Sequence, residues 1–345
     1  MKRSIAQLWR LVSIRVAQPV RAVRTALPWL VAAAWPLPGE AQSVTQDLRS
    51  RPIRIVVASG AGGGSDITGR HVARTMGELM RHTVIVENRP GAGSSTGAEY
   101  AAKATPDGHT LFLSTGSSMV MNGFLYKNLP YEPLRDFVAV GFIVAYPFVL
   151  ITRPDLPANN LAELMKYAKE RPGKLSYASA GVGSLQHVWG TILFRSMGLD
   201  LLHVPYKGAA MAVQEMIGGR IDVMFDNLSA ARVPVAAGRV KALVVSSEQR
   251  AAQLPAVPTV NESGAARFSG ESWMGLFAPA ATPPATVNAL RTIIEGVVRD
   301  APFIARLEAA GGRVMNVPPR EQQAFLRSEI ERWGALIKQY GVKAE

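Results

Sequence analysis

Short apolar runs alternate along the chain with longer segments in which apolar residues recur at helical spacing. The short runs predict strands at 53–58, 83–87, 110–114, 137–151, 174–179, 201–204, 221–225 and 240–246. The periodic segments predict helices at 65–81, 95–104, 160–170, 184–198, 209–218, 228–237, 284–300, 301–310 and 319–340. Strands that alternate with helices are typical of an α/β fold with mainly parallel sheets.

Two regions are predicted to cross between two lobes. The run 137–151 is β-prone and is interrupted only around Tyr146 and Pro147, whereas 246–277 is rich in Pro, Ser and Gly and has weak periodicity. Two crossings place a cleft between two sheets, where strand carboxyl ends and helix N-termini meet. The predicted division is a signal peptide at 1–41, lobe one at 42–143, lobe two at 144–246, and the return crossing with the second segment of lobe one at 247–345.

The first 41 residues are predicted to be an export signal. A basic stretch precedes an apolar run from Ala26 to Leu37, and small residues then predict cleavage near Ala41. The apolar run is shorter than the roughly 20 residues that a membrane span requires. The alternative is an amphipathic N-terminal arm. We therefore expect a periplasmic mature protein that starts near Gln42.

Charge and composition narrow the function. Removal of the signal lowers the net charge from +12 to +7, and the remaining basic residues form no run of the kind that nucleic-acid binders use. The chain has no cysteine, which excludes disulfides, thiolate nucleophiles and cysteine-ligated metals. Its five histidines show no metal-ligand spacing. We expect no cofactor, no metal and no nucleic-acid partner.

The first strand leads into a glycine-rich turn at a predicted helix start. In Gly60-Ala61-Gly62-Gly63-Gly64-Ser65-Asp66, free backbone N–H groups and the helix dipole would meet in an anion site. Asp66 stands where a phosphate loop has lysine, and Ser65 stands where the dinucleotide motif has its third glycine. A smaller, less charged ligand that carries a carboxylate fits this turn better.

Other strand ends carry similar small or polar residues. The junctions Ser114–Ser118 and Ser179–Ser184 are also rich in Gly, Ser and Thr, and three such turns in one alternating fold favour a small-anion cleft. The predicted ligand-binding residues are Ser59, Ala61, Gly62, Gly63, Asp66, Ser114, Thr115, Gly116, Ser179, Ala180, Gly183, Ser184, His187, Tyr206, Asp226 and Asn227.

Several of these residues have a structural alternative. Asp66 either contacts the ligand or orders the glycine turn, and Ser184 either contacts the ligand or caps its helix. His187 lies opposite the apolar stripe of its helix, so it either meets a carboxylate when protonated or lies on the helix surface or behind the site. Asp226 and Asn227 either face the cleft or form a turn. Lys207 either adds positive field or is a solvated lysine.

An enzymatic function is not favoured. Gly93-Ser94-Ser95-Thr96-Gly97 spells a nucleophile-elbow motif, which would make Ser95 the nucleophile of a secreted serine hydrolase. The elbow requires a strand that runs directly into it, and residues 87–91 intervene. We therefore expect binding without covalent chemistry.

A series of ordered motifs gives the chain a family resemblance. It resembles the Bug-type substrate-binding proteins, the solute receptors of tripartite tricarboxylate transporters. The matching motifs are Arg51–Val57, Gly62–Asp66, Val86–Gly93, Pro106–Leu111, Asn128–Tyr131, Ser179–His187, His203–Gly208, Asp222–Asn227 and Leu254–Val260.

The resemblance implies a two-lobed periplasmic binding protein of the type II-like Venus-flytrap class, each lobe a mainly parallel sheet flanked by helices. It implies a monomer that binds a small organic anion between its lobes and delivers it to a membrane permease; a sensor for a signalling partner is the alternative. The family usually has a proline and then a bulky residue after the first strand, where this chain has Ala58 and Ser59. We therefore expect a roomier and more polar pocket than is usual in the family.

Overall fold

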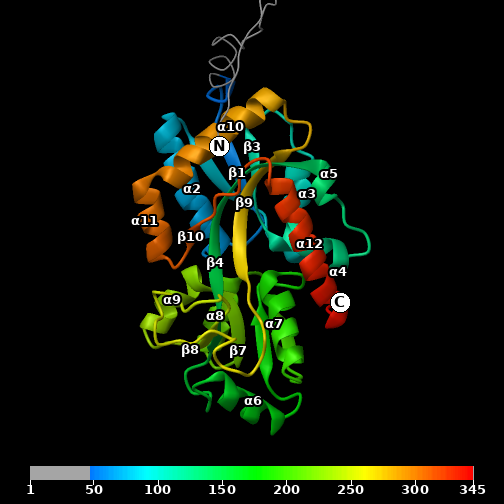
Figure 1. Ribbon diagram of the computed structural model, residues 1–345, viewed down its shortest axis with the longest axis vertical. Coiled ribbons are helices and arrows are strands. Elements are labelled where there is room, and N and C mark those ends of the chain that lie inside the picture. Colours follow the sequence, from blue (N-terminus) through cyan, green and yellow to red (C-terminus); the bar gives the residue numbers. More distant parts are fainter. Residues whose placement is uncertain (1–46, 345) are drawn as a thin grey trace, which may run out of the picture. The chain divides into compact units, whose positions relative to one another are not determined.

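The computed structural model describes residues 47–344 (Figure 1). The predicted export signal and its cleavage near Ala41 lie outside the described residues. The first elements are β1 (Ile53–Val57), α2 (Gly64–Met80), β2 (Val84–Asn88), η1 (Ala92–Ser94), α3 (Ser95–Ala102), β3 (Thr110–Thr115), the π-helix η2 (Ser117–Met121), α4 (Asn122–Leu125), α5 (Pro133–Asp136) and β4 (Phe137–Thr152). The others are α6 (Leu161–Lys169), β5 (Ser176–Ser179), α7 (Leu185–Ser196), β6 (Leu202–Pro205), α8 (Ala209–Ile217), β7 (Val223–Asn227), α9 (Leu228–Ala236), β8 (Lys241–Val245), β9 (Glu271–Pro279), α10 (Pro284–Arg299), α11 (Ala301–Ala309), β10 (Arg313–Val314) and α12 (Gln322–Gln339).

The long strand β4 is shared by two sets of strands (Figure 1). In the first sheet, β1 pairs in parallel with β2 and β3, and β9 and β4 follow as antiparallel neighbours. In the second sheet, β5 pairs in parallel with β6 and β7, while β4 pairs antiparallel with β7 and β8. With the helices around each sheet, this makes the two-lobed α/β fold that the sequence predicts.

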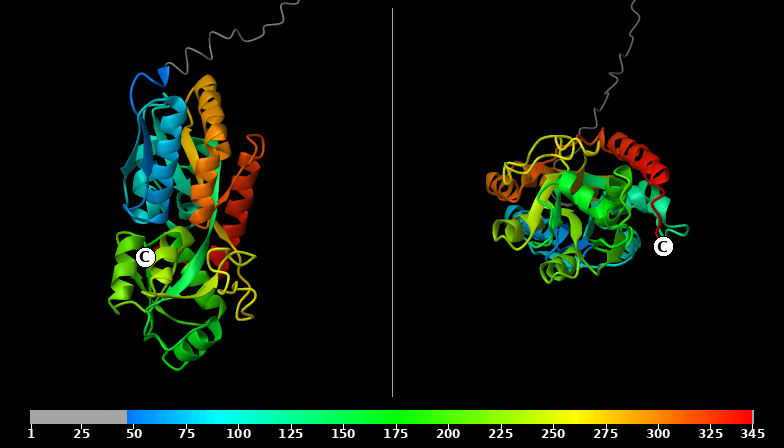
Figure 2. Two further views of the ribbon diagram at one scale, coloured as in Figure 1. Left: turned by 90° about the vertical axis from the view of Figure 1, so that its left-hand side faces the viewer. Right: turned by 90° about the horizontal axis from the view of Figure 1, so that it is seen from below.

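The strand β4 changes partners between Pro147 and Phe148. Pro147 is the last residue opposite β9, and Phe148 is the first opposite β7. Ser246 fixes this point, because its Oγ accepts a hydrogen bond from Phe148 N–H (2.8 Å) and donates one to Gly270 O (2.6 Å). Both crossing connections therefore meet at one hydroxyl, and β4 runs from one sheet to the other in the side view (Figure 2). The division into lobe segments made from the sequence remains a proposal.

The predicted strands and helices are present within a few residues of their predicted ends, but the strand β9 was not predicted. The expectation of a weakly structured crossing over 246–277 is wrong for its last residues, because β9 begins at Glu271. From Ser272 to Pro279 every residue of β9 is buried, so the apolar and polar alternation that reveals a half-buried strand is missing. The two-residue strand β10 was also not predicted.

Helices cover both faces of each sheet. In β1, Ile55 and Val57 belong to a buried cluster that also contains residues of α2, α10 and α11, whereas Val56 belongs to the cluster that contains residues of α3 and α12. This is the two-residue period of a strand that is buried on both faces. In β7, Phe225 packs towards α7, and Met224 packs towards α8 and α9.

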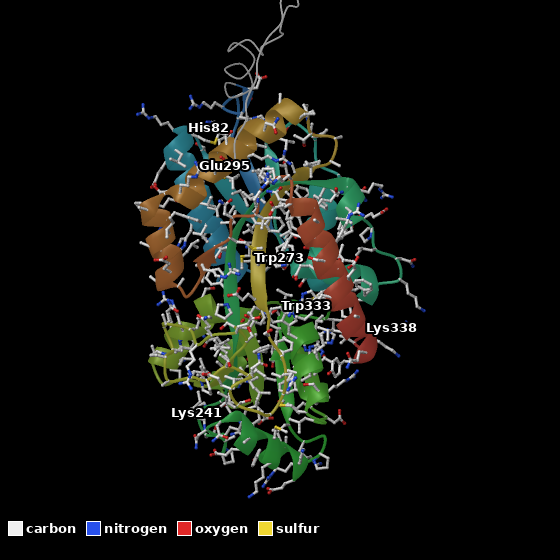
Figure 3. The ribbon with its side chains drawn as sticks, viewed as in Figure 1. His82, Lys241, Trp273, Glu295, Trp333 and Lys338 are labelled. Atoms are coloured by element: carbon white, nitrogen blue, oxygen red, sulfur yellow. The ribbon has the colours of Figure 1, made fainter. Side chains whose placement is uncertain are left out.

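The helix α12 connects the two lobes on one side (Figure 3). The ring of Trp333 on α12 stacks on that of Trp189 on α7, with centroids 5.0 Å apart and an interplanar angle of 17°. Glu329 Oε2 accepts hydrogen bonds from the indole N–H groups of Trp333 (3.2 Å) and of Trp273 on β9 (2.9 Å). Among residues 47–344, no helix is long and apolar enough to cross a membrane.

One close approach positions the end of β1, and it yields a prediction on stability. A Cβ placed on Gly97 of α3 would lie 2.6 Å from Ala58 Cβ, which is inside normal contact distance. Because this overpacking forces the helix away from the strand end, Gly97→Ala is expected to lower the free energy of unfolding by about 1–3 kcal/mol. Chemical denaturation measures the change. Gly123→Ala is the control, since a Cβ at Gly123 would meet no atom within 4 Å; equal stability of the two variants would contradict this account.

Candidate functional site

A cavity of about 590 Å³ lies at the carboxyl ends of the parallel strands of both sheets. Its walls include residues that directly follow β1, β5 and β6, the segment from Pro90 after β2, and Thr115 and Asn227 at the ends of β3 and β7. Phe148, at the point where β4 changes partners, also lines it. The cavity therefore occupies the place where open α/β sheets bind their ligands.

The start of a helix lines the cavity at five places. The residues that precede α2, α3, α7, α8 and α9 are Gly63, Ser94, Ser184, Gly208 and Asn227, and all five belong to the wall. The first N–H groups of a helix have no partner within it, and the helix dipole makes this end positive. Five such ends around one space favour an anion, although side chains cap α7 and α9.

In the part of the wall that the structure describes, the single charged side chain is positive, which also favours an anion. Among the described residues of the lining, Lys207 is the only one of the types Lys, Arg, His, Asp and Glu. It is exposed, and its carbonyl oxygen approaches the first lobe, 3.2 Å from a Cβ placed on Gly60. No carboxylate lines the cavity among these residues.

Contacts across the cleft show that it is closed. Tyr126 Oη, after α4 in the first lobe, donates a hydrogen bond to Val182 O in the second lobe (3.0 Å). A Cβ on Gly93 would lie 2.7 Å from the same carbonyl oxygen, and one on Gly64 would lie 2.9 Å from Ser229 Oγ. The glycines thus let the two walls approach closely enough to enclose a small molecule.

The predicted ligand-binding residues divide into two groups. Those that line the cavity are Ser59, Gly63, Thr115, Ala180, Ser184, Tyr206 and Asn227. Those outside its lining are Ala61, Gly62, Asp66, Ser114, Gly116, Ser179, Gly183, His187 and Asp226. Several of the second group support the wall from behind.

Asp66 orders the glycine turn. Its Oδ2 accepts a hydrogen bond from Gly62 N–H (2.9 Å), and its Oδ1 accepts one from Asn88 Nδ2 (2.9 Å). Burial disfavours the charged form, but hydrogen bonds from Arg70, Gly62 and Asn88 outweigh it and hold the pKa of Asp66 below its usual range. Of the two alternatives for Asp66, the structure supports the second, in which Asp66 orders the glycine turn and does not contact the ligand.

His187 requires a correction. It is 6% exposed, its ring stacks on that of His203 with centroids 4.2 Å apart, and its Nδ1 accepts a hydrogen bond from Gly183 N–H (3.2 Å). Burial, with smaller contributions from His203 and Arg195, lowers the pKa of His187 to about 3, and burial lowers that of His203 to about 4. The expectation that a protonated His187 meets a carboxylate is wrong, because a neutral His187 lies behind the loop and supports it.

Ser114, Ser179 and Ser184 use their hydroxyl groups within the protein. Ser184 Oγ donates to Gly181 O (2.6 Å) and accepts from His187 N–H (3.3 Å), so it is a helix cap that also lines the cavity. Ser179 Oγ contacts His203 Nε2 (2.7 Å), and Ser114 Oγ contacts Ser118 Oγ (2.6 Å).

Several wall residues were not predicted as ligand contacts. They are Pro90 to Ser94, Ser117, Tyr126, Phe148, Leu185, Gln186, Ser272 and Met274, with Ala58, Gly60, Gly64, Ser65, Gly181, Val182, Lys207, Gly208 and Ala209 in and beside the predicted turns. The segment 90–94 follows β2 and contains Pro and two Gly, a turn signal as clear as those used for the other junctions. Ser272 and Met274 lie on β9, so they were missed together with that strand.

The elbow serine has a structural partner. Ser95 is buried outside the cavity lining, and its Oγ accepts a hydrogen bond from Asn122 Nδ2 (3.0 Å). Within residues 47–344, no group of three or more His, Asp or Glu side chains is arranged to hold a metal ion.

Asp226 is buried beside the cavity with an unsatisfied carboxylate oxygen. It is 1% exposed, and its Oδ1 accepts hydrogen bonds from Asn227 N–H (2.8 Å) and from Nε2 of the wall residue Gln186 (3.3 Å). Its Oδ2 has no hydrogen-bond partner among the described residues. Burial raises the pKa of Asp226 to about 6. A buried polar atom without a partner is costly, and such groups concentrate at functional sites.

The fold and the cavity are those of a two-lobed solute-binding protein. Residues 68–342 match the family model described as the tripartite tricarboxylate transporter family receptor. The chain belongs to this family, which is a class of transporter receptors and not a class of enzymes, and the resemblance seen in the sequence is confirmed.

Individual relatives agree with this assignment. The chain is 38% identical over 296 residues to the UPF0065 protein of the tcbD-tcbE intergenic region of Pseudomonas sp. strain P51, covering 86% of this chain and 88% of that one. It is 32% identical to BugT of Bordetella pertussis, covering 85% and 90% of the two chains.

Solved structures show the same fold. The structure of periplasmic binding protein BugD has a TM-score of 0.82 at 36% identity, covering 85% of this chain and 99% of that one. MatC from Rhodopseudomonas palustris with bound malate has a TM-score of 0.80 at 30% identity, covering 84% and 99%. Another R. palustris protein, with adipate, has a TM-score of 0.82 at 29% identity, covering 85% and 98%.

The buried Asp226 gives a pH-dependent prediction. A carboxyl whose pKa is raised by folding stabilises the native state below its unfolded pKa of 3.8, and this stabilisation is lost as the pH rises through about 6. Asp226→Asn removes this dependence. Between about pH 4 and pH 7.5, the free energy of unfolding of the variant should therefore rise relative to wild type by on the order of 2–3 kcal/mol. Denaturation at a series of pH values measures this difference.

Asp136→Asn is the matched control with the opposite sign. A hydrogen bond from Arg135 holds the pKa of Asp136 below its usual value, so this variant should lose stability relative to wild type as the pH rises. Parallel pH profiles for Asp226→Asn and wild type would contradict the raised pKa.

Proposed function

We propose that this protein binds a small organic anion, a dicarboxylate or a closely related acid, in the cavity between its lobes and delivers it to a membrane permease. The observation that carries the proposal is the convergence of five helix N-termini on a closed cavity without a lining carboxylate. Backbone N–H groups bind a carboxylate well, and the cavity volume of about 590 Å³ lies within the usual range for small ligands.

The relatives with known ligands support the same class of molecule. MatC is described with malate and another R. palustris protein with adipate, and both are dicarboxylates. Both ligands bring two anionic groups to one site, which suits a cavity that has helix starts on both of its sides. The family supports delivery to a permease, because its members are named as receptors of a tripartite transporter.

Ser59 is proposed to adjust the choice of ligand. Its Oγ lies buried at the cavity wall and has no hydrogen-bond partner among residues 47–344. A hydroxyl in this state gains a partner when a polar ligand enters. The proposal of a roomier and more polar pocket than in related receptors rests on this group.

Binding of an acid is expected to raise the melting temperature of the mature protein. The test is a thermal-shift screen of the chain from Gln42 onward with dicarboxylates, tricarboxylates, acidic amino acids and uncharged amides of matched size. A ligand at about a thousand times its dissociation constant adds roughly 4 kcal/mol to the native state, which moves melting by several degrees. Shifts with the amides but not with the acids would contradict the proposal.

Ser59→Phe is expected to change the ligand preference without unfolding the protein. The added ring fills part of the cavity and removes the free hydroxyl, so affinity for the longest acid that binds should fall by at least about tenfold, a change of roughly 1.4 kcal/mol. Isothermal titration compares two acids of different length. Ser328→Phe, on the exposed side of α12, is the control for a surface phenylalanine; an unchanged preference in Ser59→Phe would remove Ser59 from the account.

A further inference from the structure

We propose that Asp226 orients the side-chain amide of Gln186 so that its oxygen faces the cavity, and that the protein therefore prefers carboxylates that also carry a hydroxyl or an ammonium group. This inference rests on the proposed function and refines its substrate class. Asp226 acts here as a positioning residue, and Gln186 is the residue that would touch the ligand.

Gln186 is placed to contact a ligand. It lies in the first turn of α7, two residues after the cap Ser184, and lines the cavity. Its side chain is partly exposed, whereas its neighbours Leu185 and His187 are buried. Its Nε2 lies 3.3 Å from Asp226 Oδ1, so a residue 40 positions further along the chain holds it.

The hydrogen bonds of Asp226 decide which way the amide turns. Its Oδ1 accepts from Asn227 N–H (2.8 Å), and an oxygen that acts as an acceptor there requires a donor from any further partner. Gln186 therefore presents its NH₂ group to Oδ1. The other end of the amide, Oε1, then accepts no hydrogen bond within residues 47–344 and is not one of the buried unpaired atoms. An accessible acceptor on a wall residue is available to the ligand.

One oxygen of Asp226 holds the amide. Oδ1 accepts hydrogen bonds from both Asn227 N–H and Gln186 Nε2, whereas Oδ2 has no partner among the described residues. An asparagine would keep its own oxygen against Asn227 N–H and would still accept from Gln186. The acceptor at Oδ1, and not the charge, is therefore what keeps the oxygen of Gln186 towards the cavity.

A fixed acceptor among donors selects for a particular ligand. The five helix ends provide N–H donors, which suit the carboxylate oxygens of the ligand. An ionised dicarboxylate has no donor to offer to Gln186, and two acceptors in contact leave both unsatisfied. A hydroxyl or ammonium group supplies the missing donor. Sites built to hydrogen-bond such a group discriminate strongly against analogues that lack it.

The experiment is isothermal titration at neutral pH with succinate, malate and aspartate, and with adipate, 2-hydroxyadipate and 2-aminoadipate. Within each set the acids differ by one hydroxyl or one ammonium group. Wild type should bind a substituted acid at least about tenfold more tightly than the unsubstituted acid of equal length. Whether hydroxyl or ammonium gives the larger ratio identifies the donor.

Asp226→Leu, which removes the acceptor, should reduce this ratio at least about fivefold, mainly because the unsubstituted acid binds better once the amide can turn. Asp226→Asn keeps an oxygen at the Oδ1 position and should retain the wild-type ratio. Gln186→Met, which keeps the size of the side chain but has no amide, should bring the ratio close to one. Asp222→Asn is the matched control, since Asp222 pairs with Arg153 (2.9 Å) outside the cavity lining, and its ratio should equal that of wild type.

The two proposals fail in different ways. If none of the acids binds, the proposed function fails and this inference fails with it. If the acids bind but wild type does not distinguish substituted from unsubstituted ones, or if Asp226→Leu keeps the wild-type ratio, the receptor function stands and the role of Asp226 and Gln186 is overturned.

Discussion

The convergence of helix N-termini on one space is the physical constraint on which the rest of the structure depends. Five strand-turn-helix units begin their helices at the cleft, so helix N-termini from both lobes line the same cavity. The shared strand β4 and the bridging hydroxyl of Ser246 hold the two sheets in register with one another. In the proposed function, this arrangement lets the protein bind an anion without a dedicated basic side chain.

The structure also contains groups that reduce stability beside the cavity. Asp226 Oδ2 and Ser59 Oγ are buried without partners, and glycines at the walls leave space for close approach of the lobes. Proteins retain such features where function requires them. The contacts between the lobes and the proposed contacts to a ligand form in the same closed state, so ligand binding and lobe closure are expected to stabilise one another.

Much of the fold could be predicted from local sequence patterns, and most of the rest depends on tertiary contacts. Gly60 to Ser65 and Ser179 to Ser184 were recognised because turn chemistry is local, whereas β9 has no alternation since both of its faces are buried. The orientation of His187 could not be derived from its helical position, because α7 is buried on the side of His187 as well as along its apolar stripe. The pair formed by Gln186 and Asp226 arises only when α7 packs beside β7.

A crystal structure of the mature protein with its bound ligand tests the central claim most directly. The account predicts a carboxylate between the lobes, with its oxygens about 3 Å from backbone N–H groups at the start of helices such as α2 and α7. A ligand held instead by Lys207 alone, or bound outside the cavity between the lobes, would contradict the account.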